Sequence, residues 1–106
     1  MTPKSTTRMQ SLDLAKSLLP VLKAISDEYR LAILLTLSEE SKTVTELTDQ
    51  LGITQPLVSH HLKALRGAGL IVATPVGRSN RYSICCDAVN EPIQLLSRLA
   101  EASPAK

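Results

Sequence analysis

Two pairs of adjacent residues could do chemistry in this chain, His60–His61 and Cys85–Cys86. Histidine and cysteine serve as metal ligands and as catalytic groups, so each pair first suggests an enzyme or a metal site. Consecutive residues of a helix diverge by about 100°, however, so the two imidazoles cannot share a ligand. The chain contains no His-x-x-x-His pair and no catalytic glycine-rich loop, and a Cys–His pair would lack an identifiable third member. We therefore predict that the protein is not an enzyme.

The two cysteines are the better candidates for binding a ligand. Neighbouring thiolates are soft ligands suited to As(III), Cu(I), Cd(II) or Hg(II), and thiols can also be oxidised or bridged across a dimer. In a strand, adjacent side chains point to opposite faces. Chelation by both Cys85 and Cys86 therefore needs the strand to end at Cys85, or a ligand from another subunit. The alternative is that one cysteine fills the core and the other has no role. Neither interpretation requires a cofactor.

Charge is unevenly distributed along the chain. The net charge is only +2, yet no Asp or Glu occurs from Leu51 to Cys86, where Lys63, Arg66, Arg78 and Arg81 are found. A purely basic segment inside a nearly balanced chain suggests an anionic partner. The alternative is a solvated face whose charge has no function.

Apolar periodicity predicts one small, mainly α-helical domain. The chain has 106 residues of which 2% are aromatic, so its core must consist of Leu, Ile, Val and Ala. We expect a flexible tail over residues 1–10, a single domain over residues 11–102 and a second tail over residues 103–106. The first predicted helix runs from Ser11 to about Ile25, with a kink or break at Pro20. The second runs from Glu28 to Leu37 after the N-cap Asp27, and the third from Glu46 to Leu51 after the N-cap Thr45. The fourth follows the N-cap Thr54 and ends at about Arg66, and the last runs from Asp87 or Asn90 to about Ala102.

Two β-rich stretches follow the fourth helix. Residues 70–76 and 81–86 are separated by Gly77–Asn80, which predicts a hairpin with a flexible tip. Val44 is a candidate for a further short strand. In the second helix, Leu31, Ile33, Leu34 and Leu37 are predicted to face the core.

The third and fourth helices have the lengths and the short connection of a helix-turn-helix. Gly52 is predicted to end the third helix in a left-handed conformation. In the fourth, Val58, His61, Leu62 and Leu65 follow the spacing i, i+3, i+4, i+7 and predict the buried stripe. His60 falls outside this stripe, so the two histidines should point in different directions.

The exposed side of the fourth helix and the hairpin tip form the predicted DNA-binding surface. Gln55 can pair with an adenine edge, while Ser59 and His60 can donate to bases or phosphates. Lys63 and Arg66 suit the phosphate backbone. The basic hairpin tip can enter a minor groove or contact phosphate. The predicted contacts are Thr54, Gln55, Pro56, Ser59, His60, Lys63, Arg66, Arg78, Ser79, Asn80 and Arg81.

The stretches "AISDEYRLAILLTL", "VTELTDQLGITQPLVSHHLKALRGAGLI" and "VGRSNRYSI" together resemble the winged helix-turn-helix repressors of the ArsR/SmtB type. The resemblance covers most of the chain. After the first helix, the family usually reads Ser/Ala-Asp-Pro-Thr-Arg. Ser26, Asp27 and Arg30 match this pattern, whereas Glu28 and Tyr29 stand in place of the Pro and Thr. The resemblance implies a mainly α-helical winged helix with about five helices and a small β-hairpin wing.

The resemblance further implies a homodimer built on the first and last helices. Such a dimer binds an inverted repeat in double-stranded DNA and releases it when an effector binds. The residues point to a dimer independently, because apolar positions cover more than one face of the first helix. One metal-sensing type of the family carries Cys-x-Cys in the third helix, where residues 45–49 of this chain have no cysteine. Another uses histidines of the last helix, which has none here. Cys85 and Cys86 remain as the candidate site for a thiophilic metal(loid), such as As(III) or Cd(II), or for a redox signal.

Several alternatives stay open from the sequence. A winged helix can bind protein rather than DNA, and a regulator can function without a metal effector. Repression rests on the resemblance alone, because no residue distinguishes a repressor from an activator. The first residues lack the apolar region of a signal peptide, and no apolar run approaches about 20 residues. We therefore expect a soluble, cytoplasmic protein without membrane contacts.

Overall fold

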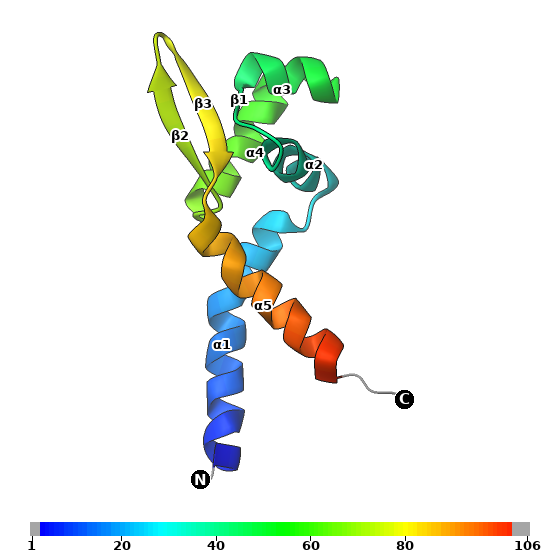
Figure 1. Ribbon diagram of the computed structural model, residues 1–106, viewed down its shortest axis with the longest axis vertical. Coiled ribbons are helices and arrows are strands. Elements are labelled where there is room, and N and C mark those ends of the chain that lie inside the picture. The colour runs from blue at the N-terminus through cyan, green and yellow to red at the C-terminus, as the bar shows by residue number, and fades with distance from the viewer. Residues whose placement is uncertain (1–2, 103–106) are drawn as a thin grey trace.

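The computed structural model describes the backbone of residues 3–102 and the side chains of residues 10–85, of Asn90 and of residues 93–101. Its extents are 55 × 28 × 20 Å. A body of three helices and a small sheet stands on two long helices that cross and then diverge (Figure 1). In chain order the elements are α1 (Pro3–Ile25), α2 (Glu28–Leu37), β1 (Lys42–Thr43), α3 (Val44–Leu51), α4 (Gln55–Gly67), β2 (Ile71–Val76), β3 (Ser79–Ile84) and α5 (Cys86–Ala102).

The sheet is antiparallel, and its strand order is β1-β3-β2. Strand β3 pairs with β2 over its whole length, from Ile71 opposite Ile84 to Val76 opposite Ser79. Gly77, with φ of 62°, permits the tight two-residue turn between them. The hairpin projects from the body as the predicted wing (Figure 1). Its tip is shorter than predicted, because Ser79 and Asn80 are paired within the sheet rather than placed in a flexible loop.

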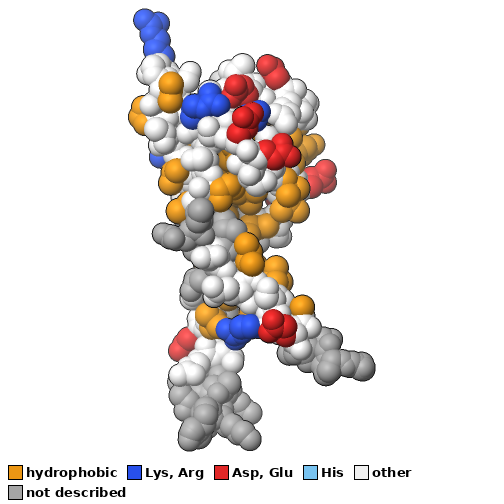
Figure 2. Space-filling view, in the orientation of Figure 1, with side chains coloured by type: hydrophobic (Ala, Val, Ile, Leu, Met, Phe, Trp, Pro, Cys, Tyr) orange, Lys and Arg blue, Asp and Glu red, His pale blue; other side chains and the backbone are white. Residues whose placement is uncertain are grey.

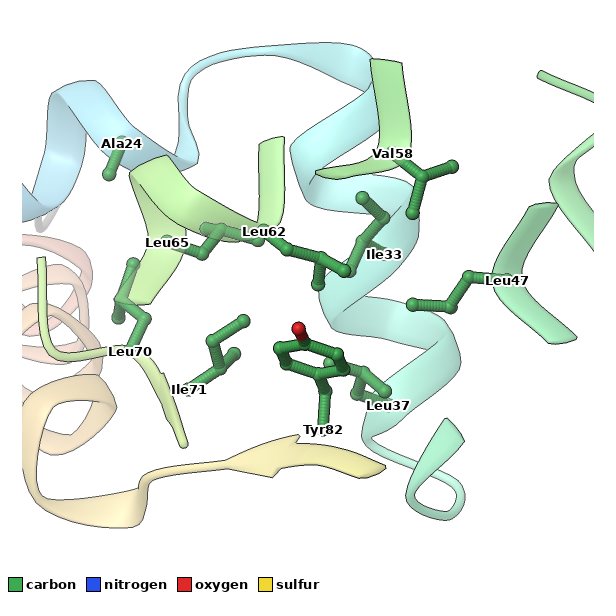
Figure 3. Close-up of a cluster of buried hydrophobic side chains, with 10 residues drawn as sticks. All are labelled: Ala24, Ile33, Leu37, Leu47, Val58, Leu62, Leu65, Leu70, Ile71 and Tyr82. Atoms are coloured by element: carbon green, nitrogen blue, oxygen red, sulfur yellow. The ribbon is translucent and has the colours of Figure 1, made fainter. Parts of the chain in front are cut away.

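An aliphatic core holds the body together (Figure 3). Its most deeply buried side chains come from α2, α3, α4 and the segment after α4, so no two elements could form it alone. Full burial of each Leu, Ile or Val contributes about 1.5–3 kcal/mol. These side chains are Ile33, Leu47, Val58, Leu62, Leu65 and Leu70. Tyr82 of β3 is also buried and joins the sheet to this cluster.

The helix boundaries around the helix-turn-helix follow from local hydrogen bonds. The Asp27 carboxylate accepts from the backbone N–H groups of Tyr29 and Arg30, as its predicted N-cap role requires. The predicted cap at Thr54 is also confirmed, since its hydroxyl accepts from the backbone N–H of Leu57 at 3.4 Å. Gly52 ends α3 with φ of 70°, which confirms the predicted left-handed conformation.

Three predicted helix starts are wrong. Helix α1 begins at Pro3 rather than Ser11, because proline is tolerated in a first turn and no later residue of the predicted tail interrupts a helix. Helix α3 begins at Val44 rather than Glu46: Thr43 is its N-cap and forms a capping box with Glu46, so Val44 is not in a strand. Helix α5 begins at Cys86 rather than at Asp87 or Asn90.

Two further expectations also fail, and a third fails in part. Strand β3 ends at Ile84 rather than Cys86. Helix α1 is not broken at Pro20, whose exposed position lets water bind the carbonyl that proline leaves without a donor, so only the kink remains of the predicted kink or break. In α2, Ile33 and Leu37 are buried as predicted, but Leu31 is exposed. The predicted C-terminal tail, residues 103–106, lies outside the described residues. No helix in the described part of the chain is long and apolar enough to cross a membrane.

Substitution of Gly52 tests the turn between α3 and α4. Gly52→Ala is expected to lower the free energy of unfolding by about 1 kcal/mol, because a left-handed conformation disfavours any side chain. A Cβ at this position meets no atom within 4 Å, so backbone strain is the only cost. Urea unfolding measures the change. Gly67→Ala is the control, since its Cβ also enters open space and alanine favours a helix. Equal losses in both variants would contradict this explanation.

Candidate nucleic-acid interface

Helix α4 is amphipathic in the way the sequence predicts. Val58, His61, Leu62 and Leu65 are all buried against the body, which confirms the predicted stripe. The opposite side is exposed and carries no acidic residue. Gln55, Ser59, Lys63 and Arg66 succeed one another at intervals of three or four residues, so they share one face of the helix. The exposed residues of α4 and its cap that were predicted to contact DNA are Thr54, Gln55, Pro56, Ser59, His60, Lys63 and Arg66.

The beginning of α4 is electrostatically suited to an anion. Its first turn has no acidic side chain, and the residues there, Gln55 and Pro56, are exposed. The N-terminus of a helix carries a partial positive charge and N–H groups without helical partners. An anion such as a DNA phosphate can therefore approach this end of α4 without meeting a competing carboxylate of the helix.

The wing and the start of α4 meet at a polar hollow of about 200 Å³. Gln55 lines it from α4, and Ser79 and Asn80 line it from β3. The structure thus brings together side chains separated by more than twenty positions in the sequence. Thr43 and Thr45, which the sequence analysis did not include in the surface, line the same hollow from α3 and its cap. Neither stands out in the sequence, because both are uncharged and lie outside the predicted recognition helix and hairpin tip. Only the tertiary structure brings them to this surface.

Arg78 lies in the exposed turn of the wing, beside Gly77. Arg81, by contrast, is half buried and bonded within the protein. Its Nη2 donates to the carbonyl oxygen of Ser41 at 2.8 Å, and its Nε donates to the Ser41 hydroxyl at 3.2 Å. The same guanidinium lies 3.4 Å from a carboxylate oxygen of Glu46. Arg81 therefore joins the wing to the segment before α3 and to α3 itself. In this respect it differs from the other predicted contacts, which are exposed.

A partly buried hydrogen bond joins α4 to α2. The Nε of Arg30 donates to Nδ1 of His61 at 3.1 Å, and Tyr29 lies beside the same imidazole. Since Nδ1 accepts, a neutral His61 carries its proton on Nε2. That atom is buried and has no hydrogen-bond partner among the described residues; a carboxylate oxygen of Asp27, 3.8 Å away, faces it. The predicted division of the histidines is confirmed, because His60 is exposed.

The surroundings of His61 favour its neutral form. Burial lowers the pKa of His61, and the Asp27 carboxylate only partly opposes this effect. The pKa of Asp27 is itself lowered, chiefly by the hydrogen bond from the backbone N–H of Arg30. Protonation of His61 at Nδ1 would place an N–H against the Arg30 donor. Acid should therefore break this hydrogen bond between α2 and the buried side of α4.

The two cysteines lie at the junction of β3 and α5. Cys85 is half buried, carries a free thiol and follows the last residue of the strand, and its backbone N–H donates to the carbonyl of Leu70 at 2.8 Å. Cys86 begins α5, and its side chain lies outside the described residues. Among the side chains that the structure describes, no three His, Cys, Asp or Glu residues gather as metal ligands.

Comparison with known proteins identifies the family. The family model described as "Bacterial regulatory protein, arsR family" matches residues 27–72, from the cap of α2 into β2. An uncharacterised HTH-type transcriptional regulator of Methanocaldococcus jannaschii is 41% identical over 80 residues, which are 74% of this chain and 90% of that protein. The chain belongs to the ArsR family. The sequence-based prediction of this family, and of a regulator rather than an enzyme, is confirmed.

Solved structures place this ArsR-family protein among winged helix-turn-helix regulators. An ArsR-like transcriptional regulator from a Rhodococcus species has a TM-score of 0.71 at 30% identity and covers 82% of each chain. Reduced HlyU from Vibrio cholerae has a TM-score of 0.73 at 31% identity, over 85% of this chain and 95% of that one. The HTH-type transcriptional repressor SmtB of Mycobacterium tuberculosis is 42% identical over 60% of this chain but only 47% of its own length. The protein is thus a DNA-binding transcription regulator with the predicted fold.

The pH dependence of folding tests the environment of His61. Because the pKa of His61 is lower in the folded state, the unfolded chain binds this proton at a higher pH. The contribution of neutral His61 to stability is thus present above about pH 7 and is lost as the pH falls below it. His61→Gln is expected to reduce the loss of unfolding free energy between about pH 7.5 and 5.5 in urea titrations. His60→Gln, on the exposed side, should change the stability at pH 7.5 by less than about 0.5 kcal/mol. An unchanged pH slope in His61→Gln would contradict this role.

Proposed function

We propose that the protein is a sequence-specific regulator that recognises DNA with α4 and the wing. The observation that carries this proposal is the exposed, acid-free face of α4, whose first residue meets the wing at a polar hollow. Gln55, Ser59 and His60 stand nearest the start of α4, where helix-turn-helix proteins contact base edges. Lys63 and Arg66 lie further along the same face and suit phosphates.

In this proposal the wing supplies the second contact. Arg78 is exposed at the turn and can reach a neighbouring groove or phosphate, while Ser79 and Asn80 line the hollow beside Gln55. Arg81 acts as a positioning residue, because its hydrogen bonds to Ser41 hold the wing at a set angle to the helices. Thr54 caps α4 and Pro56 shapes its first turn, so both orient the contact surface.

We further propose that two copies associate through α1 and α5. An apolar groove of about 340 Å³ runs between these helices, and its lining includes Leu14, Leu19, Leu95 and Leu99. Leucines grouped on the exposed surface of two neighbouring helices indicate a protein–protein interface. A related structure from Mycobacterium bovis, a winged helix-turn-helix domain 26% identical with a TM-score of 0.70, is described as homodimeric. Two-fold symmetry would place two α4 helices about 34–36 Å apart, which suits an inverted-repeat operator.

The proposed mode of regulation is repression that an effector relieves. The relatives include the repressor SmtB of Mycobacterium tuberculosis and the transcriptional activator HlyU of Vibrio cholerae, which is 35% identical over 74% of this chain. Repression follows from simple occupancy of an operator and needs no further contact with the transcription machinery.

For the effector we propose a thiophilic metal(loid), such as As(III) or Cd(II), or an oxidant acting at Cys85 and Cys86. The end of β3 at Ile84 supports this choice, because the alternation of strand side chains does not then separate the two thiols. Both cysteines belong to the junction with α5, so a change there would reach the proposed dimer helix directly.

Substitutions on α4 test DNA recognition. Gln55→Ala should weaken binding to the preferred operator by about 1–3 kcal/mol and relax the choice of one base pair, because a bidentate base contact is lost. Lys63→Ala should weaken binding to all sequences and reduce the salt dependence by about one counterion. Fluorescence anisotropy over a salt series measures both effects. Lys23→Ala, an exposed lysine of α1, is the control. Absence of duplex binding even at low salt would instead favour a protein-binding winged helix.

Substitution of both cysteines tests the sensor. Cys85→Ser/Cys86→Ser should bind operator DNA as tightly as the parent protein but remain bound when arsenite, Cd(II) or peroxide is added. The parent should be released by at least one of these agents, because thiolates bind or react with all three. Operator titrations with and without reductant make the comparison. Release of the double variant by the same agent would exclude these thiols, and a parent that no agent releases would indicate a regulator without such an effector.

A further inference from the structure

A second apolar surface lies along α2, and none of the residues predicted to contact DNA lines it. It is a groove of about 400 Å³ between α2, the end of β3 and α5, and Ser38 is its single polar lining residue among those described. Leu31 is 45% exposed, Leu35 is 63% exposed and Ile93 is 53% exposed. Aliphatic side chains grouped in this way on a small monomer mark a contact surface rather than ordinary exposed residues.

This surface continues into the groove between α1 and α5. Ile93 lines the α2 groove, and Leu95 and Leu99, a few residues further along α5, line the α1–α5 groove. Leu96, between them, is exposed. Figure 2 shows hydrophobic side chains extending from the body down onto the upper part of the leg formed by α5. Helix α5 thus joins two apolar grooves into one surface.

We infer that a second copy of this chain covers the α2 groove, so that the dimer interface extends from α1 and α5 onto Leu31 and Leu35. This inference rests on the dimer proposed above and states where its interface ends. The described lining residues of the groove carry no charge and all but Ser38 are aliphatic, which suits an apolar partner. An apolar surface that is continuous with a self-associating one is suited to the same self-complementary contact.

The extended interface would connect assembly to DNA recognition. Leu31 and Leu35 belong to the helix whose first turn carries Arg30, and Arg30 is hydrogen-bonded to His61 of α4. The partner would therefore contact α2, the helix that is hydrogen-bonded to α4. In such a dimer, α2 sets the spacing and angle of the two α4 helices, whereas contacts through α1 and α5 alone would leave α2 uninvolved.

Sedimentation of charged variants tests the inference. Leu31→Lys/Leu35→Lys is expected to raise the dimer dissociation constant at least about tenfold, because two lysines would be desolvated in the interface. Leu96→Lys/Leu99→Lys probes the proposed α5 contact and should dissociate the dimer. Val72→Lys/Val76→Lys, at exposed apolar positions of the wing, is the matched control and should leave the dimer intact. A normal dimer in the α2 variant together with a dissociated α5 variant would overturn this inference but leave the dimer proposal standing. A parent protein that is monomeric at every concentration would overturn both.

A chemical measurement avoids dependence on the folding of the lysine variants. In the Cys85→Ser/Cys86→Ser background, the thiol introduced by Leu35→Cys should react with N-ethylmaleimide at least about tenfold more slowly at concentrations that favour the dimer than at those that favour the monomer. The thiol introduced by Val76→Cys should react at the same rate at both. Equal rates for Leu35→Cys would show that the groove stays open in the dimer, available to some other apolar ligand, and would overturn the inference.

Discussion

The packing of α4 into the aliphatic core is the interaction on which the other features of this protein depend. Four consecutive contacts along one side of the helix, from Val58 to Leu65, fix its rotation about its own axis. Once that side is buried, the opposite side must be exposed, and its polar and basic residues form a single face. The hydrogen bond between Arg30 and His61 adds direction to this packing, because an apolar contact alone would tolerate small rotations.

A single copy of the chain leaves apolar side chains of α1 and α5 exposed to solvent. The core of the body consists mainly of side chains from α2, α3 and α4. Helices α1 and α5, by contrast, line a groove between them and retain exposed leucines. A short chain with few aromatic residues cannot cover such surfaces from within. Association with a second copy is the simplest physical solution, and the proposed continuation onto α2 would make the geometry of DNA recognition a property of the dimer.

Local chemistry was sufficient to predict much of the fold. The caps at Asp27 and Thr54 and the left-handed Gly52 depend on neighbouring residues only, and the buried stripe of α4 depends on helical periodicity. The start of α3 was misplaced because Thr43 and Thr45 can both act as caps, and only the capping box with Glu46 distinguishes them. The hydrogen bonds of Arg81 could not be predicted either. Its partner Ser41 is distant in the sequence and becomes adjacent only when β1 pairs with β3.

The sequence by itself determined the family, the winged helix-turn-helix and which side of α4 faces outward, because helical periodicity and capping act over a few residues. Tertiary structure alone decided which side chains meet across elements. It placed Gln55 beside Ser79 and Asn80 and hydrogen-bonded Arg81 to Ser41. It also joined Arg30 to His61 and left Leu31 and Leu35 on the surface. Each of these outcomes depends on how helices and strands pack in three dimensions, and no pattern within a single element contains that information.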